Sequence, residues 1–589
     1  MTVIRREDID FWLVDWLDVG ALTRLPRFAG QTLDDYAAFL DLGEKIAQQA
    51  FWPSYKAGDR EEPRLDANGR VVVQSQVAAA VRAYLNAGLH LATVDAEHGG
   101  LQLPVAVASA VGAIVMAANI SAAGFSMLST ANARVLAAFG TPEVIAAFAA
   151  PQFAGEALGT MCLSEPDAGS SLGDIVTRAE PDGEDGLGRR YRLRGRKMWI
   201  SGGDQDIVAQ TIHLVLAKIP DAAGKLAPGA KGVSLFVVPA VLPDGRRNDV
   251  AVAGLNHKMG YRGIPNCALN FGEGEGARGW LIGDPGEGLR IMFQMMNEAR
   301  IGVGLGAAAL AYRGFAQSLA YAAERRQGRP LGHKGEGAPV PILRHPDVRR
   351  MALAQKAIAE GALALCLYSA KLADLSGHAV DEAERVRAQA LLDLLTPVTK
   401  SWPSEMGLAA NHLAIQIHGG YGYTRDFDVE QIFRDNRLNP IHEGTTGVQA
   451  LDLLGRKMLF DGLQAFDVFL QALRRTAGSA GEIPELAAFA ETLRAQAARI
   501  EALVRREAAA PMQALALATP FLFAFGHLVV GWLWLDMADA ATRGNARVRP
   551  GKIAACRYFY EYEMPVIDAW LAPLASRSDL TAALDESCL

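Results

Sequence analysis

Residues 161–171 read Met-Cys-Leu-Ser-Glu-Pro-Asp-Ala-Gly-Ser-Ser, and at this stretch the sequence pattern changes from helix to strand. Upstream, apolar residues recur at three- and four-residue spacing through 77–92, 105–118 and 132–150, which is typical of packed helices. The stretch itself runs from an apolar strand into a Pro/Gly turn with three hydroxyls. Such a loop presents backbone N–H groups and hydroxyls to an anion or a ring carbonyl, although an ordinary β-turn explains it equally well.

Short strand-like runs follow this loop, and turn clusters such as Asp182–Gly186 and Pro243–Gly245 separate them. The runs are Gly159–Ser164, Ile175–Ala179, Arg190–Gly195, Met198–Ser201, Thr211–Ile219, Gly232–Pro239 and Ala268–Phe271. They predict a compact, mostly antiparallel β domain inserted into a helical protein.

Long helical patterns return from residue 286 onward. The predicted fold class is therefore mainly α with an inserted antiparallel β domain. The predicted domains are an N-terminal helical arm (1–40), a helical domain (41–157), the β domain (158–280), a second helical domain (281–457) and an extra C-terminal helical domain (458–589).

Composition excludes several classes of protein. The 589 residues carry a formal net charge of −7 and no long basic run, so nothing favours nucleic-acid binding. The five cysteines are scattered without metal-ligand spacing, and His412 and His418 are too far apart to share a helix face, so we expect no metal site and a reduced, cytoplasmic protein. Residues 514–535 have the length of a membrane span, but Pro520 and His527 interrupt them, so we expect a buried helix instead of a span.

The stretch Asn439–Gln449, Asn-Pro-Ile-His-Glu-Gly-Thr-Thr-Gly-Val-Gln, holds one carboxylate among small and hydrogen-bonding residues. We expect Pro440 to bring the chain extended to Glu443, and Gly444 to let a ligand approach beside the carboxylate. Two threonines follow where a helix N-cap belongs. A surface acid at a helix start is the plainer explanation of such a glutamate.

Two further loops could bind a planar or phosphorylated ligand. Lys197–Gly203 (Lys-Met-Trp-Ile-Ser-Gly-Gly) could stack its tryptophan on a ring, although a core tryptophan is commoner. Gln416–Tyr423 (Gln-Ile-His-Gly-Gly-Tyr-Gly-Tyr) has more glycines than a helix cap needs. In contrast, Gly302–Ala307 fits a dinucleotide fingerprint but follows a helix, so we expect a helix–helix contact there.

In this order, the motifs resemble those of the acyl-CoA dehydrogenase family of flavoproteins. Leu163–Ser170 is similar to the first signature of the family, Gln416–Asp426 to much of the second, and Glu443–Thr445 to its base loop. The resemblance covers about residues 37–457, and the extra C-terminal block resembles that of the larger bacterial members. It implies a helical domain, a β-barrel, a four-helix bundle and a further C-terminal bundle.

The resemblance also implies roles. FAD would be bound by Met161, Leu163, Ser164, Gly169, Ser170, Trp199, Ile200, Ser201, Arg325, Gln416, Gly419, Gly420, Thr445 and Gly447, of which Arg325 and the 416–420 loop would serve a neighbouring subunit. The acyl-CoA would be bound by Ser170, Asn297, Arg300 and Gly444. A homodimer, or a dimer of dimers, follows from the shared FAD site.

Glu443 would be the catalytic base that removes the α-proton of an acyl thioester, with electrons passing to electron-transfer flavoprotein. Some members carry the base on the helix before Arg300 instead, where this sequence has Ala299. Several positions depart from the family pattern: Ser171, Asn297, Gln431 and His442 replace commoner residues, and the aromatic residue after Gln327 is missing. An oxygen-using oxidase and a flavin-bearing relative without dehydrogenase activity are the alternatives, and both methylthio-propanoyl and medium- or long-chain acyl thioesters are candidate substrates.

Overall fold

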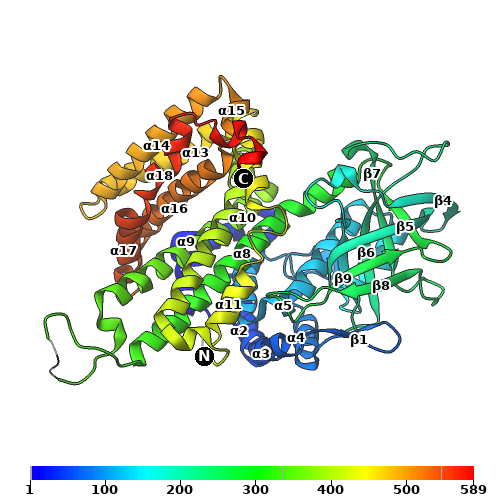
Figure 1. Cartoon of the computed structure of the whole chain (residues 1–589), viewed down its shortest axis with the longest axis horizontal. Helices are drawn as coiled ribbons and strands as arrows, with labels where there is room; N and C mark the ends of the chain where they lie inside the picture. Colours follow the sequence, from blue (N-terminus) through cyan, green and yellow to red (C-terminus); the bar gives the residue numbers. More distant parts are fainter. Residues whose placement is uncertain (1–2, 334, 336, 545–546) are drawn as a thin grey trace. The chain divides into compact units, whose positions relative to one another are not determined.

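The computed structural model describes residues 3–333, 335, 337–544 and 547–589, with the side chains of 293–298 excepted. Its contacts divide the chain into two compact units, coloured by sequence in Figure 1. The first unit holds Ala38–Leu103 and Ile114–Ala299, and the second holds residues 3–37, Pro104–Ala113 and Arg300–Leu589.

The first unit contains the predicted β domain as a closed sheet. Its strands are β3 (Ala157–Cys162), β4 (Arg178–Asp185), β5 (Gly188–Ser201), β6 (Gln210–Lys218), β7 (Val233–Pro239), β8 (Val250–Leu255), β9 (Asn266–Phe271) and β10 (Ala277–Ile282). Because β10 pairs with both β7 and β5, the path β10-β7-β6-β4-β5 closes on itself as a barrel, and β9 and β8 extend it from β5. All pairings are antiparallel except those of β6 with β3 and with β4. The predicted barrel is confirmed.

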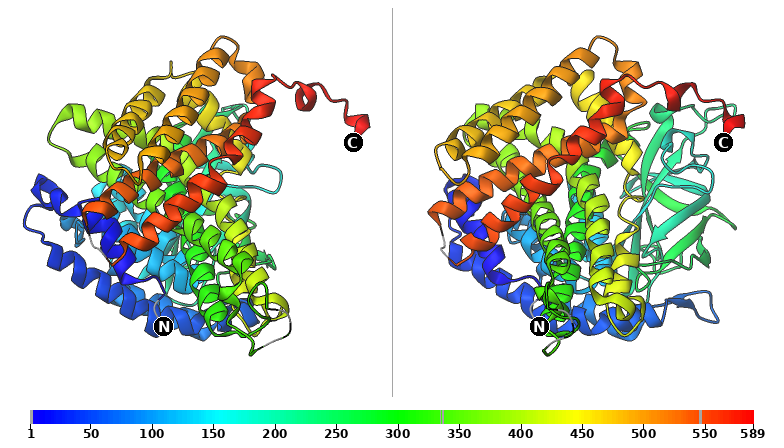
Figure 2. Two further views of the ribbon diagram at one scale, coloured as in Figure 1. Left: turned by 90° about the vertical axis from the view of Figure 1, so that its left-hand side faces the viewer. Right: turned by 60° about the vertical axis from the view of Figure 1, so that its left-hand side comes forward.

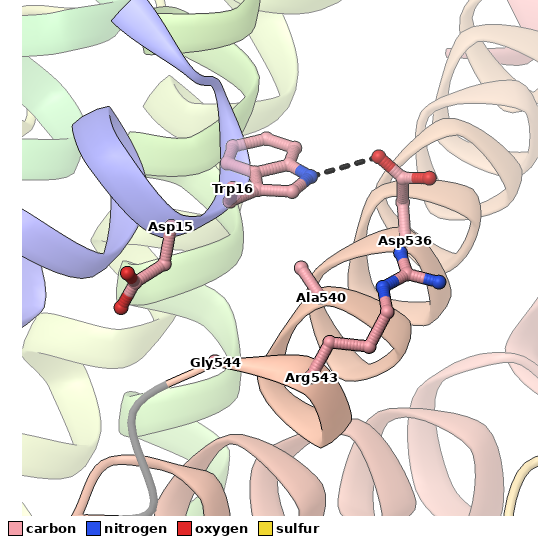
Figure 3. A pocket seen from close by; sticks show the side chains of 6 residues that line it. All are labelled: Asp15, Trp16, Asp536, Ala540, Arg543 and Gly544. Atoms are coloured by element: carbon pink, nitrogen blue, oxygen red, sulfur yellow. Dashed lines mark hydrogen bonds between the residues drawn. The ribbon is translucent and has the colours of Figure 1, made fainter. Parts of the chain in front are cut away.

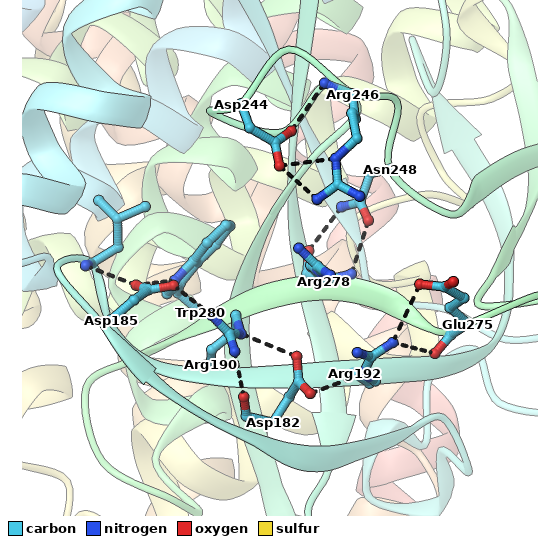
Figure 4. A network of polar contacts seen from close by, with 11 residues as sticks. Asp182, Asp185, Arg190, Arg192, Asp244, Arg246, Asn248, Glu275, Arg278 and Trp280 are labelled. Carbon is cyan, nitrogen blue, oxygen red and sulfur yellow. Dashed lines mark hydrogen bonds and ion pairs between the residues drawn. The ribbon is translucent and has the colours of Figure 1, made fainter.

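Charged side chains follow the outer face of this barrel (Figure 4). Asp182 accepts ion pairs from Arg190 at 3.0 Å and from Arg192 at 2.9 Å, and Asp185 accepts the indole N–H of Trp280 at 2.9 Å. These contacts tie β4, β5 and β10 together. Because the side chains are partly exposed, each ion pair contributes little to stability, and their alternation with buried residues fixes which face is outside.

The first unit also contains helices, some of which share an apolar core with the barrel. They are η4 (Ala47–Phe51), α3 (Trp52–Arg60), α4 (Ser75–Asn86), η5 (Leu89–Leu91), η6 (Ala96–His98), α6 (Pro142–Val144), η7 (Ile145–Ala149) and α7 (Ala150–Phe153), with the short hairpin β1 (Arg64–Leu65) and β2 (Val71–Val72). The C-terminal half of α5 (Val105–Phe139) packs Ala133 and Leu136 against Ile212 and Leu214 of β6 in one apolar core. Removing this apolar surface from water is what holds helix and sheet together.

The long helices of the second unit are drawn green to red in Figures 1 and 2. They are α8 (Gly288–Glu324, of which the second unit holds Arg300 onward), α9 (Pro346–His378), α10 (Glu382–His418), α11 (Val429–Asn436), α12 (Thr446–Leu451), η12 (Asp452–Leu459), α13 (Gln464–Gly481), α14 (Ala487–Glu507), α15 (Pro511–Leu515), α16 (Ala518–Arg543), α17 (Arg549–Tyr558), η13 (Phe559–Glu563), α18 (Val566–Ala575) and α19 (Leu580–Ala583). The stretch Gly302–Ala307 lies inside α8, and a Cβ on Gly304 would meet the carbonyl oxygen of Thr399 on α10 at 1.9 Å. The prediction that these glycines serve a helix–helix contact is therefore confirmed.

The N-terminal arm is tied to this unit by a buried cluster of charges. The arm comprises α1 (Arg6–Asp10), η1 (Phe11–Trp16), η2 (Val19–Arg24) and η3 (Pro26–Phe28), and α2 (Leu33–Ile46) follows it. Lys552 of α17 donates to Asp8 at 2.9 Å and to Glu360 at 2.8 Å, and all three side chains are almost fully buried. Burial would raise the pKa of Asp8, but the charges of Lys552, Lys356 and Arg5 and the hydroxyl of Tyr312 together outweigh it and hold that pKa well below its usual range.

Three helices of the described chain, α5, α9 and α16, are long and apolar enough to span a bilayer by length and composition alone. Of their most apolar windows, 78%, 83% and 89% respectively are buried inside the protein. In α16 the indole of Trp534 donates to the carbonyl oxygen of Ala357 at 3.0 Å, and Gly526 lies against Trp402 of α10. Packing against protein thus explains the apolar run around His527, as the sequence predicts.

Candidate functional site

In the β domain, two loops predicted to bind a ligand are held together by one buried ion pair. Lys197 is fully buried, and its ammonium donates to the carbonyl oxygen of Leu163 at 3.0 Å and to Glu165 at 2.9 Å. Glu165 also accepts the backbone N–H groups of Val176 and Thr177. Burial would raise the pKa of Glu165, but Lys197 and these donors together lower it, so the carboxylate stays charged. The pair fixes the loop that begins at Leu163.

Trp199 projects from a β-bulge at the end of β5. The register with β9 shifts between Lys197 and Ile200, and Trp199 adopts a φ of +67° in the left-handed region. Its side chain is 62% exposed, although tryptophan usually prefers burial. The neighbouring N–H of Met198 donates to the carbonyl oxygen of Ser164 at 3.0 Å, so the exposed indole and the serine loop belong to one rigid assembly.

The other predicted residues of this region divide by exposure. Gly169 and Ser170 are exposed, while Ser164 and Ser201 are half-buried. Met161 and Leu163 pack part of their side chains on the apolar core, and the side chain of Ile200 is buried and therefore closed to a ligand. An exposed aromatic face beside hydroxyls suits a planar ring with polar edges.

In the second unit, the Glu443 loop is closed by short hydrogen bonds. The N–H of Thr446 donates to the carbonyl oxygen of Pro440 at 3.1 Å, and Gln449 donates to the carbonyl oxygen of Glu443 at 3.2 Å. Thr445 caps α12, as predicted, by accepting the N–H of Val448. Glu443 itself has a φ of +52°, and Gly444 follows with +91°.

The approach to Glu443 differs from the extended chain predicted from Pro440. The N–H groups of Ile441 and His442 both donate to the carbonyl oxygen of Leu438, so the chain turns tightly after α11. The prediction was wrong because the backbone carbonyl at the end of the helix captures these donors. The tight turn leaves the carboxylate at the apex of a rigid loop.

A line of buried amide side chains anchors this apex to α8 and α10. His442 Nε2 lies 3.0 Å from Asn439 Oδ1, Asn439 donates to Asn436 at 2.8 Å, and Asn436 donates to Asn411 at 2.6 Å. Asn411 then donates to the carbonyl oxygen of Leu310 at 3.0 Å. Burial, with a contribution from Lys400, lowers the pKa of His442 to about 3, so the imidazole is neutral at physiological pH.

The charge state of Glu443 is set by opposing effects. Burial raises the pKa of Glu443, and the nearby charges of Lys400 and Arg300 hold back part of that rise. Arg300 is buried and ion-paired with Asp452 at 2.9 Å, and Arg456 pairs with the same carboxylate at 2.7 Å. A carboxylate whose pKa is raised by burial is a stronger base than one in water.

The remaining residues predicted to bind FAD lie at helix ends and in the Glu443 loop. Arg325, Gln416, Gly419 and Gly420 are exposed at the ends of α8 and α10, Thr445 is exposed, and Gly447 is half-buried. The side chain of Asn297 lies outside the described residues, as does that of Glu298 beside Ala299. Their binding roles stay predictions.

Two buried lysines were missed by the sequence reasoning. Lys197 and Lys400 are both fully buried. Lys197 follows Arg194 and Arg196, and Lys400 stands between Thr399 and Ser401, so neither lies in an apolar run that would predict its burial.

A polar hollow between the N-terminal arm and α16 is a weaker candidate (Figure 3). Its lining residues are Asp15, Trp16, Asp536, Ala540, Arg543 and Gly544. Asp536 already accepts the indole N–H of Trp16 at 2.8 Å and the hydroxyl of Thr476 at 3.0 Å. These contacts explain the hollow as part of the packing of the arm. Within the described part of the chain, no group of three or more His, Cys, Asp or Glu side chains could hold a metal.

Comparison with known proteins identifies the class. The profile of the family domain described as "Acyl-CoA dehydrogenase, middle domain" matches residues 160–273, that of "Acyl-CoA dehydrogenase, C-terminal domain" matches 286–459, and that of "Acetyl-CoA dehydrogenase C-terminal like" matches 469–585. The chain is 35% identical to 3-methylmercaptopropionyl-CoA dehydrogenase of Ruegeria pomeroyi, over 97% of both proteins. It therefore belongs to the acyl-CoA dehydrogenase family, whose members are FAD-dependent oxidoreductases acting on acyl-CoA.

Other relatives agree with this assignment. A butyryl-CoA dehydrogenase of Syntrophomonas wolfei is 31% identical, over 95% of this chain and 94% of that protein. Among solved structures, an acyl-CoA dehydrogenase of Bacillus anthracis complexed with FAD has the same fold, with a TM-score of 0.75 and 20% identity over 98% of this chain and 93% of that one. The exposed indole of Trp199 and the hydroxyl of Ser164, which makes no hydrogen bond within the described residues, fit a flavin ring.

Proposed function

We propose that the chain converts an acyl-CoA thioester to the trans-2-enoyl-CoA, and that Glu443 is the base that removes the α-proton. The observation that carries this proposal is the strained, rigidly hydrogen-bonded loop that holds Glu443 at a φ of +52° next to two cations. Strained backbone persists only where its surroundings enforce it, and it is frequent at active sites.

The residues of the chain would divide the work as follows. Glu443 takes the proton, and its burial raises its pKa toward that of an effective base. Trp199, Ser164, Ser170 and Ser201 bind the FAD, with Arg325, Gln416, Gly419 and Gly420 serving the FAD of a neighbouring subunit. Bound FAD supplies the acceptor for the β-hydride, which no side chain can provide. Arg300 and Gly444 lie on the side of the acyl-CoA.

Three further proposals concern the substrate, the partners and the location of the protein in the cell. The substrate is a methylthio-propanoyl thioester or a medium- to long-chain acyl-CoA, and the first is supported by the 35% identity with an enzyme named for that substrate. The electrons pass to electron-transfer flavoprotein, and the active form is a homodimer or a dimer of dimers. The protein works in the cytoplasm, which the free cysteines of the described chain support.

The test is anaerobic titration of the purified yellow protein with a panel of acyl-CoA thioesters, followed by flavin absorbance. We expect at least one thioester to bleach the wild-type flavin, and Glu443→Gln to keep its FAD but lose the bleaching. Glu382→Gln, on the exposed first turn of α10, is the matched control and should bleach as the wild type does. Bleaching of Glu443→Gln at the wild-type rate would show that another group is the base.

The same preparation tests the acceptor. Added electron-transfer flavoprotein should reoxidise the reduced enzyme far faster than dissolved oxygen does. Rapid release of peroxide without that partner would identify an oxidase instead.

A further inference from the structure

Lys197, Lys400 and Lys552 are almost fully buried, and Lys400 differs from the other two in its hydrogen bonds. Lys197 donates to Leu163 and Glu165, and Lys552 donates to Asp8 and Glu360. The ammonium of Lys400 is equally buried, yet among the side chains and backbone that the structure describes it has no hydrogen-bond partner. An unsatisfied buried ammonium costs several kcal/mol, so packing alone favours an apolar residue at this position.

Lys400 is also held in place. It lies in the interior of α10, where its own carbonyl oxygen accepts the hydroxyl of Ser404 at 2.6 Å. At this level α8 approaches so closely that a Cβ on Gly304 would lie 3.4 Å from the Cα of Lys400. The close approach of the two helix backbones restricts the paths by which the side chain could reach water.

The titratable groups near Lys400 come from the Glu443 loop, α10 and α8. Glu443 and the neutral His442 face it from the loop, Glu405 from α10 itself and Arg300 from α8. Burial lowers the pKa of Lys400 to about 8, and the two carboxylates oppose that fall. Glu405 is itself bound to the loop, because Thr446 donates its hydroxyl to it at 2.6 Å.

Of the two cations near Glu443, Lys400 is the one whose charge is not already paired. Arg300 is neutralised by Asp452 of η12 at 2.9 Å, and Arg456 shares that carboxylate. Lys400 is accordingly the stronger of the two in lowering the pKa of Glu443 against the effect of burial. A base must be deprotonated to act, so this compensation has a direct consequence for the reaction.

We propose that Lys400 is a positioning residue for the catalytic base: its buried ammonium, which has no hydrogen-bond partner in the described chain, keeps the carboxylate of Glu443 charged. This inference rests on the proposed role of Glu443. A role toward Glu443 explains why this position holds a charged lysine, although a methionine would pack there at a lower free-energy cost.

The experiment compares Lys400→Met, Lys400→Gln and Lys400→Arg with the wild type and with Glu443→Gln. Infrared difference titration follows the protonated carboxyl band that is lost in Glu443→Gln, and stopped-flow absorbance follows flavin reduction from pH 5 to 10, roughly the range in which enzyme bases titrate. Removing a nearby cation raises the pKa of a carboxyl. We therefore expect both midpoints to move to higher pH by about one unit or more in Lys400→Met and Lys400→Gln.

Below the wild-type midpoint this shift means about a tenfold slower flavin reduction, with recovery at alkaline pH. Lys400→Arg keeps the charge and should keep the wild-type midpoint. FAD content should be unchanged, and Lys400→Met should unfold at the same temperature as the wild type or higher, because an unsatisfied charge is gone.

Three results would overturn the proposal. One is an unchanged midpoint in both neutral variants, another is a loss of rate that is equal at every pH, and the third is unfolding of both neutral variants. Failure of the proposed function is separately visible, because then either no thioester bleaches the wild type or Glu443→Gln bleaches as fast as the wild type, whatever the Lys400 variants do.

Discussion

Backbone strain at single residues links the two predicted loops. Trp199 and Glu443 are non-glycine residues with φ values of +67° and +52°, and both belong to the set that the sequence motifs single out. Left-handed backbone also occurs elsewhere in the described chain, at Leu463 for example, so strain alone does not mark a site. It becomes informative where, as at these two residues, hydrogen bonds on both sides keep the strained residue in place.

Replacing Gly444 by alanine tests how strongly the reaction depends on this strain. Gly444 has a φ of +91°, and an added Cβ would lie 2.4 Å from Gln449 Nε2, the atom that holds the carbonyl of Glu443. Left-handed backbone costs an alanine about 1–2 kcal/mol, so the loop should shift. We expect flavin reduction to slow by about tenfold or more while FAD is retained, since misplacement of a base is costly.

Gly478→Ala is the control for this substitution, because nothing lies within 4 Å of its added Cβ in α13. It should leave the rate of flavin reduction unchanged. A Gly444→Ala enzyme with normal rates would mean that the loop tolerates a different conformation.

At the level of elements, the buried cluster at Lys552 decides whether the N-terminal arm stays docked. Lys552→Met removes the fully buried cation that Asp8 and Glu360 share, and leaves them with the half-exposed Arg5 and with Lys356 beside Glu360. Removing one partner of a buried ion pair destabilises by about 3–5 kcal/mol, so thermal unfolding should begin at a clearly lower temperature. Arg557→Met on the same helix removes only an exposed ion pair with Glu561 and should change stability by less than about 0.5 kcal/mol. Equal effects of the two substitutions would show that the cluster contributes nothing.

Helices and strands that depend on neighbouring residues could be predicted from the sequence, and those that depend on distant pairing partners could not. The long helices and most strands follow from apolar periodicity, and the barrel from the family resemblance. The sequence pattern predicts two runs, Arg190–Gly195 and Met198–Ser201, where the structure has the single strand β5 with Lys197 buried against Glu165. The pattern does not predict β8, which is a half-exposed edge strand, or β10, which is defined by its pairing with distant β5 and β7.

Residues of the candidate site could likewise be predicted where they carry a local motif, and not where their role depends on distant contacts. Glu443, Trp199 and the serine loop carry local motifs, so the sequence identified them. Lys400 and the amide line from Asn439 to Asn411 have no motif, since their roles depend on α8, α10 and the loop meeting in space. Arg300 was predicted on the acyl-CoA, and its ion pair with Asp452 could not be foreseen from a separation of 152 residues.

On the scale of the whole molecule, the C-terminal helices are packed as part of the second unit. Trp534 of α16 donates to the carbonyl oxygen of Ala357 on α9, and Gly361 of α9 lies against the same indole. The predicted boundary at residue 457 therefore separates sequence blocks whose apolar surfaces cover each other. An enzyme ending at residue 457 would expose the apolar faces of α9 and α10 that α16 covers.

The proposed dimer can be tested, because the resemblance assigns each FAD to residues of two subunits. Gly169→Glu places a negative charge where the FAD phosphates are expected, and Arg325→Glu does the same from the neighbouring subunit. Gly169 has open space around its Cβ, and Arg325 is exposed, so both variants should fold. Each variant alone should lose most of its FAD.

Co-expression of the two variants with different tags, followed by purification on both tags, selects the mixed dimer. In that dimer one site carries both substitutions and the other carries neither, so its FAD content should recover to about half of the wild-type value. Two differently tagged Gly169→Glu chains form the control and should show no recovery. An absence of recovery in the mixed dimer would place each FAD within a single subunit. Normal FAD content in either variant alone would remove that residue from the FAD site.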